Sequence, residues 1–521
     1  MSFSSGRWEQ YRHRIQAQKL RKSTETGQEP TPLKFRLSEN LEQIRQMFDQ
    51  TSDLVIREIT LGSRQAAMVC MEGMTNLQAV AQGILNPLLK AEYPRQSPEQ
   101  QFDAIKTTVL ALSEQSELAD YEQLCGIIMS GFAVILLDEW NKGIAVGAQG
   151  FNFRSVSEPA TENMQRGSRE GFVEVLRINV TMVRRRMKST DLRIEMLKVG
   201  TNSHTDACLC YLRGAVSAEI LNQVRARLKS VPLENVLETG FLQPYLEKKP
   251  TSLFSGVGIC ERPETLCGKI SEGRIAILVD GTPIALIVPY LFSENFQSFD
   301  DYADRPYFAT FTRWLKYCAF LVAILLPGVF VAMGTYHPEM FPTPLLYNLA
   351  VAEASQPLSL MTEALLIHLI YELMREAGLR LPKPIGHVVG IIGGLVIGDA
   401  AISAGLISAP MIVVVAITAL SSFTIPQLYE PMAILRFVFI LVGGTAYLMG
   451  VMLVLAAVIV NLCAINPYGV PYTAPLSPMR LKSWRDVLVR SGWKDLAKKR
   501  VLVQNMPGSE YLRPTDKEKE V

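Results

Sequence analysis

The residues of this chain that could do chemistry are polar side chains inside its apolar C-terminal part. They include carboxyl groups, an imidazole and a hydroxyl, and they lie within or next to long apolar runs. Such groups are costly in hydrocarbon unless they meet a partner or water, so they are typical of water-filled paths through membranes. The predicted pore or polar membrane residues are Glu353, Glu363, His368, Asp399 and Ser403.

The run Pro344–Leu373 contains three of these residues and has a distinct polar face. On a helix, His368 and Glu372 share that face with Arg375 and Glu376. Two interpretations are open. The segment is either an amphipathic helix that lies at the interface or between spans, or a polar helix that faces a water-filled path.

A row of glycines precedes Asp399, and almost all residues between them are apolar. The predicted helix-packing residues are Gly386, Gly390, Gly394 and Gly398. Four-residue spacing places them on one helix face, where the backbone of another helix can approach closely. One interpretation is a tightly packed structural helix, and the other is a helix of an assembly whose polar edge lines a path. Asp399 then either faces water or caps a helix pair.

Enzyme chemistry has no sequence signal here. The chain contains no P-loop, no HExxH spacing and no nucleophile elbow, and its eight cysteines form no CxxC pair. We therefore expect no catalytic residues, no metal site and no cofactor, and the chain is not expected to be an enzyme.

Composition divides the chain into unlike parts. With 521 residues and a mean hydropathy of +0.16, it is long enough for at least two folding units. Apolar runs dominate from about Leu315 to Cys463, and basic clusters lie on both sides of them. Basic flanks favour the cytoplasmic side of a membrane, so both termini are expected there. No nucleic-acid binding is expected, because the basic clusters bracket a membrane domain.

The expected organisation is an α/β cytoplasmic region of two subdomains, followed by an all-α polytopic membrane domain. The parts are a basic flexible arm (1–36), α/β subdomain 1 (37–151), α/β subdomain 2 (152–310), a transmembrane helical domain (311–466) and a basic cytoplasmic tail (467–521). No apolar core of signal-peptide length occurs in residues 1–40, so the N-terminal region is expected to stay in the cytosol.

Periodicity predicts the elements of the two subdomains. The first should contain a capped helix from Ser38, strands at Leu54–Ile59 and Ala66–Met71, helices at Thr75–Leu89 and Pro98–Leu112, and strand-rich runs at Gly126–Leu137 and Gly143–Gln149. The second should contain helices at Gly171–Met187 and Ser217–Ser230, strands at Arg193–Val199 and Ala207–Leu212, and a hairpin from Arg274 to Val288. The hairpin turn is Asp280-Gly281, which favours the positive φ that tight turns need.

Four to six membrane crossings are predicted, and cytoplasmic termini favour an even number. The spans are Leu315–Gly334, Ile385–Ile407, the short Met411–Ile425, and Met432–Asn461 as one tilted or two tightly turned segments. Arg436 lies in the last of these and is expected to snorkel to the interface or to pair with Glu430.

Several longer motifs resemble a known family. They are Ser52–Glu58, Arg169–Phe172, Leu176–Asn179, Arg184–Arg186, Leu237–Gly240, Glu261–Pro263, Glu272–Pro283, Asp300–Tyr302, Arg375–Gly378 and Ser477-Pro478. The pattern is similar to that of the A subunits of GerA-type spore germinant receptors, and the resemblance extends from about Leu37 to Gly492.

The resemblance implies a membrane subunit of the inner spore membrane that works with a permease-like B subunit and a lipoprotein C subunit. It also implies a homo-oligomeric ring that conducts ions when a partner senses a nutrient. A paralogous A-like protein of the spore-specific channel system shares this layout. The alternatives are a non-conducting scaffold that organises germination complexes and a stand-alone secondary transporter. A transporter would show internal repeats with paired broken helices, and none is visible on the two sides of Gly405.

Overall fold

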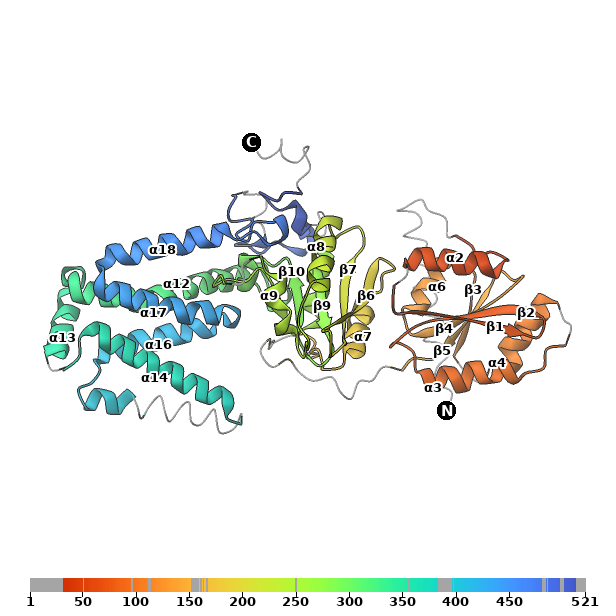
Figure 1. Ribbon diagram of the computed structural model, residues 1–521, viewed down its shortest axis with the longest axis horizontal. Coiled ribbons are helices and arrows are strands. Elements are labelled where there is room, and N and C mark those ends of the chain that lie inside the picture. Colours follow the sequence, from red (N-terminus) through yellow and green to blue (C-terminus); the bar gives the residue numbers. More distant parts are fainter. Residues whose placement is uncertain are drawn as a thin grey trace. The chain divides into compact units, whose positions relative to one another are not determined.

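The computed structural model describes two compact units (Figure 1). One comprises residues 1–156 and 177–196, and the other comprises residues 157–176 and 197–521. The described residues are 31–49, 51–94, 97–110, 114–150, 159, 162, 164, 167–248, 251–354, 356–382, 396, 398–479, 484, 486–496 and 501–511.

The first unit contains a five-stranded antiparallel sheet with helices on both faces (Figure 1). The strand order is β1-β2-β4-β5-β3, with β1 (Leu54–Leu61), β2 (Arg64–Met71), β3 (Gln115–Leu118), β4 (Phe132–Leu137) and β5 (Gly143–Gly147). Helices α2 (Leu37–Phe48) and α6 (Tyr121–Ile128) cover one face, and α3 (Leu77–Val80), η1 (Ala81–Leu85), α4 (Asn86–Lys90), α5 (Pro98–Ala104) and η2 (Ile105–Val109) cover the other.

Strand β2 shows why both faces carry helices. Its side chains alternate between the two sides of the sheet, as in any strand. Ala67 and Val69 pack in the cluster of α2 and α6, whereas Met68 and Cys70 pack in the cluster of the opposite helices. Because apolar residues occupy both sets of positions, the sheet is stable only when both faces are buried.

The second sheet has the same chain-order pattern as the first. Its order is β6-β7-β9-β10-β8, with β6 (Leu192–Val199), β7 (Thr205–Leu212), β8 (Gly258–Cys260), β9 (Ile275–Val279) and β10 (Ala285–Val288). The helices of this subdomain are α7 (Leu176–Arg186), α8 (Ala218–Lys229), η4 (Thr239–Phe241), α9 (Gln243–Leu246) and α10 (Pro263–Ser271). The predicted hairpin is confirmed, since β9 and β10 pair antiparallel and Gly281 has a φ of +90°.

Aspartates that are distant in sequence accept hydrogen bonds from the first N–H groups of two helices. Leu37 N–H, at the start of α2, donates to Asp138 Oδ1 at 2.8 Å, and Leu176 N–H, at the start of α7, donates to Asp280 Oδ1 at 2.9 Å. Each aspartate directly follows a strand, β4 in one case and β9 in the other. The predicted capped start at Ser38 is therefore wrong: α2 begins at Leu37, and its cap comes from 101 residues away.

One predicted strand-rich run is also partly wrong. Residues 126–128, the beginning of Gly126–Leu137, are the last residues of helix α6, and only Phe132–Leu137 forms a strand. Helix α6 begins after Asp120, whose carboxylate accepts the Gln123 N–H at 2.7 Å. That capping aspartate is a local signal for a helix.

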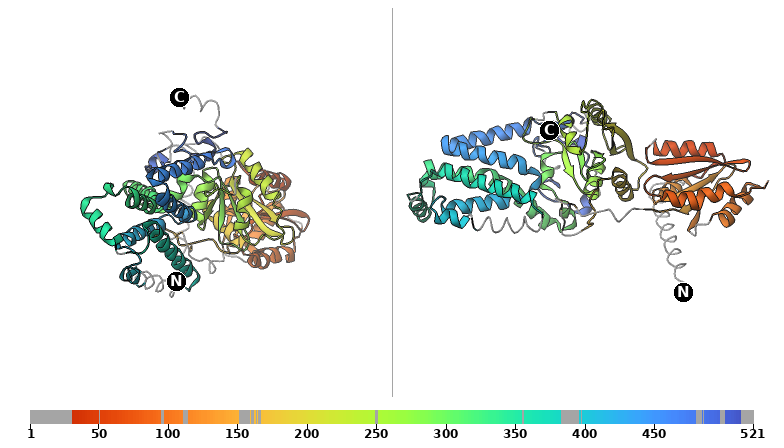
Figure 2. Two further views of the ribbon diagram at one scale, coloured as in Figure 1. Left: turned by 60° about the vertical axis from the view of Figure 1, so that its left-hand side comes forward. Right: turned by 60° about the horizontal axis from the view of Figure 1, so that its bottom comes forward.

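A helical bundle follows the second sheet (Figures 1 and 2). Its main helices are α12 (Pro306–Tyr336), α13 (Thr343–Ala354), α14 (Leu360–Arg380), α16 (Ala409–Phe423), α17 (Tyr429–Thr445) and α18 (Tyr447–Ala464). Shorter elements around it are η5 (Phe292–Phe296), α11 (Asp300–Ala303), η6 (Pro338–Met340), η7 (Pro426–Leu428), η8 (Pro467–Gly469), α19 (Trp493–Leu496) and η10 (Val503–Asn505).

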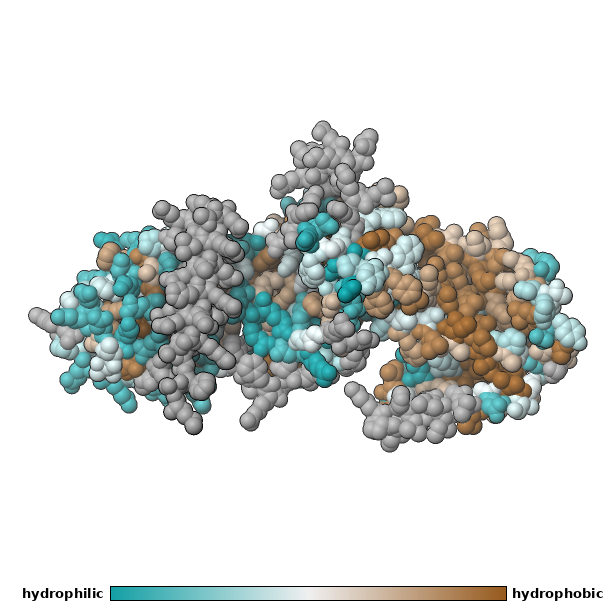
Figure 3. All heavy atoms as spheres, turned by 180° about the vertical axis from the view of Figure 1, so that it is seen from behind, coloured by the Kyte–Doolittle hydropathy of each residue, from teal (hydrophilic) through white to brown (hydrophobic). Residues whose placement is uncertain are grey.

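Among the described residues, three helices are long and apolar enough to cross a membrane: Pro306–Tyr336, Pro426–Thr445 and Tyr447–Ala464. Apolar side chains cover most of the helical region in the space-filling view (Figure 3). The predicted segment Met432–Asn461 is two helices, which separate at Tyr447 with a φ of +58°. Most of the predicted span Ile385–Ile407 lies outside the described residues.

Helices α12 and α17 cross at two glycines. A Cβ added to Gly328 would lie 2.5 Å from the Phe439 carbonyl oxygen, and one added to Gly443 would lie 2.3 Å from the Gly328 carbonyl oxygen. Only glycine permits this approach of two backbones, which is the packing mode expected between helices in lipid. This crossing was not predicted from the sequence, which indicates such packing for a different glycine row, Gly386 to Gly398.

Candidate functional site

The polar centre of the helical bundle is the Arg436 guanidinium, which is fully buried on α17. Its Nη1 lies 3.3 Å from Glu372 Oε1 on α14, and its Nη2 donates to Ser422 Oγ on α16 at 2.5 Å. Its Nε donates to the Ala323 carbonyl on α12 at 3.3 Å. This one side chain therefore connects α12, α14, α16 and α17.

Glu372 is held by two further side chains. The Tyr429 hydroxyl donates to Glu372 Oε2 at 2.7 Å, and Arg375 Nε lies 3.2 Å from the same oxygen. The Arg375 guanidinium also stacks over the Tyr429 ring at 3.8 Å. We call Arg436, Glu372, Ser422, Tyr429 and Arg375 the membrane ion-pair centre.

Both predictions for Arg436 are wrong: its guanidinium is fully buried and so does not snorkel to the interface, and it does not pair with Glu430. Glu430 is exposed in the first turn of α17, and six residues of helix place it about 240° around the axis from Arg436. The carboxylate that Arg436 contacts is Glu372, 64 residues away in sequence. Helix α14 thus directs part of its polar face toward α17.

Glu363 is a capping carboxylate in this protomer. It is fully buried, and its Oε1 accepts the Ser408 N–H at 2.5 Å and the Ser408 hydroxyl at 2.6 Å. Ser408 is the N-cap residue of α16, where the helix dipole favours a negative charge. With its amide nitrogen facing the carboxylate, Gln356 donates to Glu363 Oε2 at 3.2 Å.

The other predicted polar residues lie at three different places. His368 is fully buried one turn before Glu372; its Nδ1–H donates to the Ala364 carbonyl at 2.8 Å, and its Nε2 has no hydrogen-bond partner among the described residues. Glu353 is half-buried on α13. Asp399 and Ser403 are exposed, one turn apart, on helical residues 398–403. The structure therefore does not bring all five predicted residues together.

Of the predicted packing glycines, Gly386, Gly390 and Gly394 lie outside the described residues. Gly398 is described, and a Cβ added there would have only Ile412 Cδ1, at 4.0 Å, within reach in the described structure. Among the described residues, this glycine has room for a side chain. Its predicted role as a packing residue stays a prediction.

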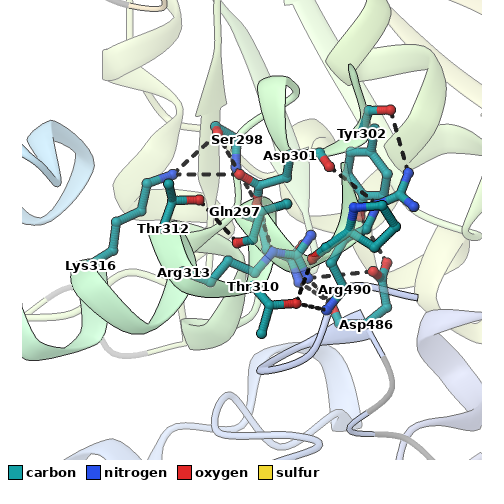
Figure 4. A network of polar contacts seen from close by, with 12 residues as sticks. Gln297, Ser298, Asp301, Tyr302, Thr310, Thr312, Arg313, Lys316, Asp486 and Arg490 are labelled. Atoms are coloured by element: carbon teal, nitrogen blue, oxygen red, sulfur yellow. Dashed lines mark hydrogen bonds and ion pairs between the residues drawn. The ribbon is translucent and has the colours of Figure 1, made fainter. Parts of the chain in front are cut away.

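A second polar centre lies at the start of α12 (Figure 4). The fully buried Arg313 donates through Nε to Asp301 Oδ2 at 2.6 Å and through Nη1 to the Asp486 carbonyl at 2.6 Å. The Tyr302 hydroxyl donates to Asp486 Oδ2 at 2.8 Å. Burial, with Asp486 nearby, raises the pKa of Tyr302, so its hydroxyl remains a donor.

Arg490 completes this centre from the C-terminal tail. Its Nε donates to the Asp301 carbonyl at 3.2 Å, and its backbone N–H donates to Thr310 Oγ1 at 3.1 Å (Figure 4). We call Asp301, Tyr302, Arg313, Asp486 and Arg490 the junction cluster. It joins the tail to the corner between α11 and α12.

A third buried carboxylate supports the chain just before this corner. Arg274 Nη2 lies 2.6 Å from Glu294 Oε1, Lys269 Nζ contacts the same oxygen, and the Leu291 N–H donates to Glu294 Oε2 at 2.8 Å. Burial by itself would raise the pKa of Glu294, but the cations Arg274 and Lys269 outweigh it, and the pKa is lowered. Glu294 therefore stabilises the fold as an anion.

The first unit has its own buried ion pair. Arg184 Nε lies 2.8 Å from Asp53 Oδ2, and its Nη2 donates to Asp53 Oδ1 at 3.0 Å. Thr51 Oγ1 donates to Asp53 Oδ1 at 2.7 Å, and Arg184 also donates to the Leu192 carbonyl at 3.2 Å. This two-pronged pair ties α7 to the segment before β1.

The partners in these centres were not predicted from the sequence, although Asp301 lies in one of the motifs, Asp300–Tyr302, that the sequence singles out. An arginine in or beside a long apolar run is a usable signal, because such a cation must find an acceptor. Within the described ranges, no group of three or more His, Cys, Asp or Glu side chains could hold a metal ion.

Together, these features define a membrane protein whose N-terminal α/β subdomains precede a helical bundle with internally paired charges. The chain belongs to the GerA family, because the model of the family described as "Bacillus/Clostridium GerA spore germination protein" matches residues 42–502. The proteins of this family are spore germination receptor subunits, which are not a known class of enzyme.

Three relatives from Bacillus subtilis (strain 168) are each 34% identical to this chain. They are the uncharacterised membrane protein YfkQ (92% of this chain and 93% of that protein), spore germination protein KA (88% and 85%) and spore germination protein B1 (87% and 94%). A crystal structure of the N-terminal domain of the A subunit of the Bacillus megaterium germinant receptor GerK3 is 30% identical, with a TM-score of 0.39; the match covers 51% of this chain and 99% of that one.

Proposed function

We propose that this chain is the membrane subunit of a nutrient-responsive spore germination receptor, and that several copies surround an ion path. The observation that carries the proposal is the exposure of Asp399 and Ser403 on the protomer surface. They lie within Ile385–Ile407, a stretch that is predicted to cross the membrane. A charge that faces lipid is costly, so this surface requires water, a second copy, or both.

The membrane ion-pair centre supports the same proposal from inside the protomer. Its charges are satisfied within one chain, so the bundle can insert without a partner for Arg436. Asp399, in contrast, has its side chain at the outer surface. The pore surface is therefore assigned to helical residues 398–403, together with the preceding glycine row, and not to the interior of one bundle.

The partners are proposed from the family relation: a permease-like B subunit that senses the nutrient and a lipoprotein C subunit, in the inner spore membrane. The N-terminal region and the tail are placed in the cytoplasm. Arg305, Arg313 and Lys316 lie near the start of α12, and basic residues at the end of a span favour the cytoplasmic side.

The test is the ion selectivity of the complete receptor in liposomes. Asp399→Lys should shift the reversal potential toward the equilibrium potential of the anion, because a ring of charges that lines a path selects ions of opposite sign. The matched control is Glu339→Lys, at an exposed carboxylate in the short helix after α12. An unchanged reversal potential in Asp399→Lys would remove this residue from the path, and absence of any ion flux would favour the scaffold alternative.

Assembly has a separate test. Gly390→Leu and Gly394→Leu should abolish the oligomer of the purified chain if the glycine row is a contact between copies. Gly126→Leu is the control, because Gly126 lies on an exposed position of α6 with no atom near an added Cβ in the described structure. Normal oligomers of both membrane variants would show that the row serves another contact.

A further inference from the structure

The first turns of α12 carry large apolar side chains that no part of the described protomer covers. Their exposed fractions are 71% for Tyr307, 49% for Phe308, 62% for Phe311, 50% for Trp314 and 53% for Leu315. These positions recur with helical spacing and therefore form one stripe along the helix. On the opposite side of the same turns, Ala309 and Arg313 are buried, and Arg313 belongs to the junction cluster.

The stripe continues without a break into the span. Cys318 and Leu321 are exposed on the same face, seven residues beyond Phe311 and Trp314 respectively. In the middle of a membrane-crossing helix, an exposed apolar face meets lipid tails. Toward the N-terminus of α12, the same face must leave the lipid tails and enter the headgroup layer on that side of the membrane.

The length of α12 locates this layer. From Trp314 to Tyr336 the helix rises about 33 Å, which matches the roughly 30 Å of a hydrocarbon core. At the far end, the ring centroids of Tyr336 and Tyr447 lie 4.0 Å apart with their planes tilted by 39°, and Tyr447 is half-exposed. Two aromatic groups one hydrocarbon thickness apart are typical of a membrane protein's two interfaces.

The C-terminal tail adds a residue to the near group. Trp493 is 63% exposed, and its ring lies 6.1 Å from the Tyr302 ring and 5.3 Å from the Arg490 guanidinium. The Arg490 backbone N–H donates a hydrogen bond to Thr310 Oγ1 on α12. The junction cluster therefore holds Trp493 beside the first turns of α12, and the exposed cations Arg305 and Lys494 flank the group.

We propose that Tyr307, Phe308, Phe311, Trp314 and Trp493 form an interfacial platform that binds the headgroup layer of an anionic phospholipid leaflet. The aromatic rings suit the boundary between tails and headgroups, and Arg305 and Lys494 suit the phosphates. The junction cluster fixes the tail to α12, so the platform keeps the corner between the α/β subdomain and the first span at a constant depth. This inference requires membrane insertion and is independent of ion conduction.

Tryptophan quenching by brominated lipids tests the platform. The full chain has five tryptophans, and variants that keep only Trp314, only Trp493 or only Trp140, with phenylalanine at the other positions, would be reconstituted in liposomes that contain phosphatidylglycerol. Trp314 and Trp493 should lose most fluorescence with bromines near the headgroups and less with bromines deep in the tails. Trp140, in the first unit, should lose none. Absence of quenching at Trp314 or at Trp493 would overturn the platform.

Two further measurements separate lipid from protein as the occupant. If a second copy covered the stripe, Phe311→Cys in a chain that also carries Cys318→Ser and Cys463→Ser would form a disulfide between copies in the membrane, and that result would overturn the proposal. Asp486→Asn should weaken the quenching of Trp493 and leave that of Trp314 unchanged, because the Asp486 carboxylate anchors the tail through the Tyr302 hydroxyl at 2.8 Å and Arg313 Nη1 at 3.4 Å. Unchanged quenching at Trp493 in this variant would show that the junction cluster does not hold the platform together.

Discussion

Replacing Glu372 with glutamine removes the only carboxylate that the buried Arg436 guanidinium contacts among the described residues. Arg436 would keep its hydrogen bonds to Ser422 and Ala323. Its fully buried positive charge, however, would no longer have Glu372 as its negative partner. Removal of one partner from a buried ion pair costs about 3–5 kcal/mol. The Glu372 side chain is 18% exposed, so the lower end, about 3 kcal/mol, is expected.

The assay is thermal unfolding of the full chain in detergent. For a folding unit of roughly 150–250 residues, 1 kcal/mol corresponds to about 2–4 °C, so Glu372→Gln should lower the midpoint by about 6–12 °C. Arg436→Met should cost less, because Glu372 would keep Tyr429 and Arg375 as partners. The double variant should cost less than the sum of the single variants, by about 0.5–3 kcal/mol.

Glu376→Gln is the matched control on the same helix. Glu376 lies one turn from Glu372 and pairs with Arg380 at the surface, where side-chain exposures are 49% and 78%. Such a surface pair is worth about 0–1 kcal/mol. A midpoint that Glu372→Gln lowers no more than Glu376→Gln does, or additive effects of Glu372→Gln and Arg436→Met, would contradict a stabilising buried pair.

Three other outcomes are expected from single features of the fold. Gly443→Leu should prevent the crossing of α12 and α17 and abolish folded monodisperse protein in size-exclusion chromatography, whereas Gly378→Ala, with open space at its Cβ in the described structure, should be tolerated. The pKa of Glu294 is lowered in the folded state, so Glu294 contributes to the free energy of unfolding above the unfolded-state pKa of about 4.3. That contribution is lost as the pH falls through the folded-state pKa. Glu294→Gln should therefore lower stability at pH 7 and make stability depend less on pH in the acid range. Arg184→Leu should cost about 3–5 kcal/mol in denaturant unfolding, whereas Arg177→Leu, which breaks an exposed pair with Glu72, should cost at most about 1 kcal/mol, and equal costs would contradict the role of burial.

Local patterns were sufficient for most elements of the α/β subdomains. The β9–β10 hairpin was predictable because Asp280-Gly281 specifies its turn without help from the rest of the chain. Residues 126–128 were predicted as part of a strand because an apolar run around Gly126 fits a strand as well as a helix. The signal that indicates a helix is Asp120, which caps the start of α6. Periodicity alone does not separate these two states in short apolar runs.

Such patterns do not predict ion pairs between residues that are distant in sequence. Composition indicates that Arg436 needs an acceptor, and Glu430 was the nearest carboxylate in sequence, whereas the fold brings Glu372 to it. Likewise, Asp486 reaches Arg313 across 173 residues. Which carboxylate meets which cation is decided by how the helices pack, and a single sequence contains no direct record of that packing.

Ion efflux from liposomes is the decisive test of whether copies of this chain surround an ion path in a germination receptor. The full chain would be reconstituted with the proposed permease-like and lipoprotein subunits and challenged with a panel of amino acids and sugars. We expect nutrient-triggered efflux that disappears when this chain alone is omitted and that changes its ion selectivity in Asp399→Lys. Efflux that persists without this chain would contradict this expectation.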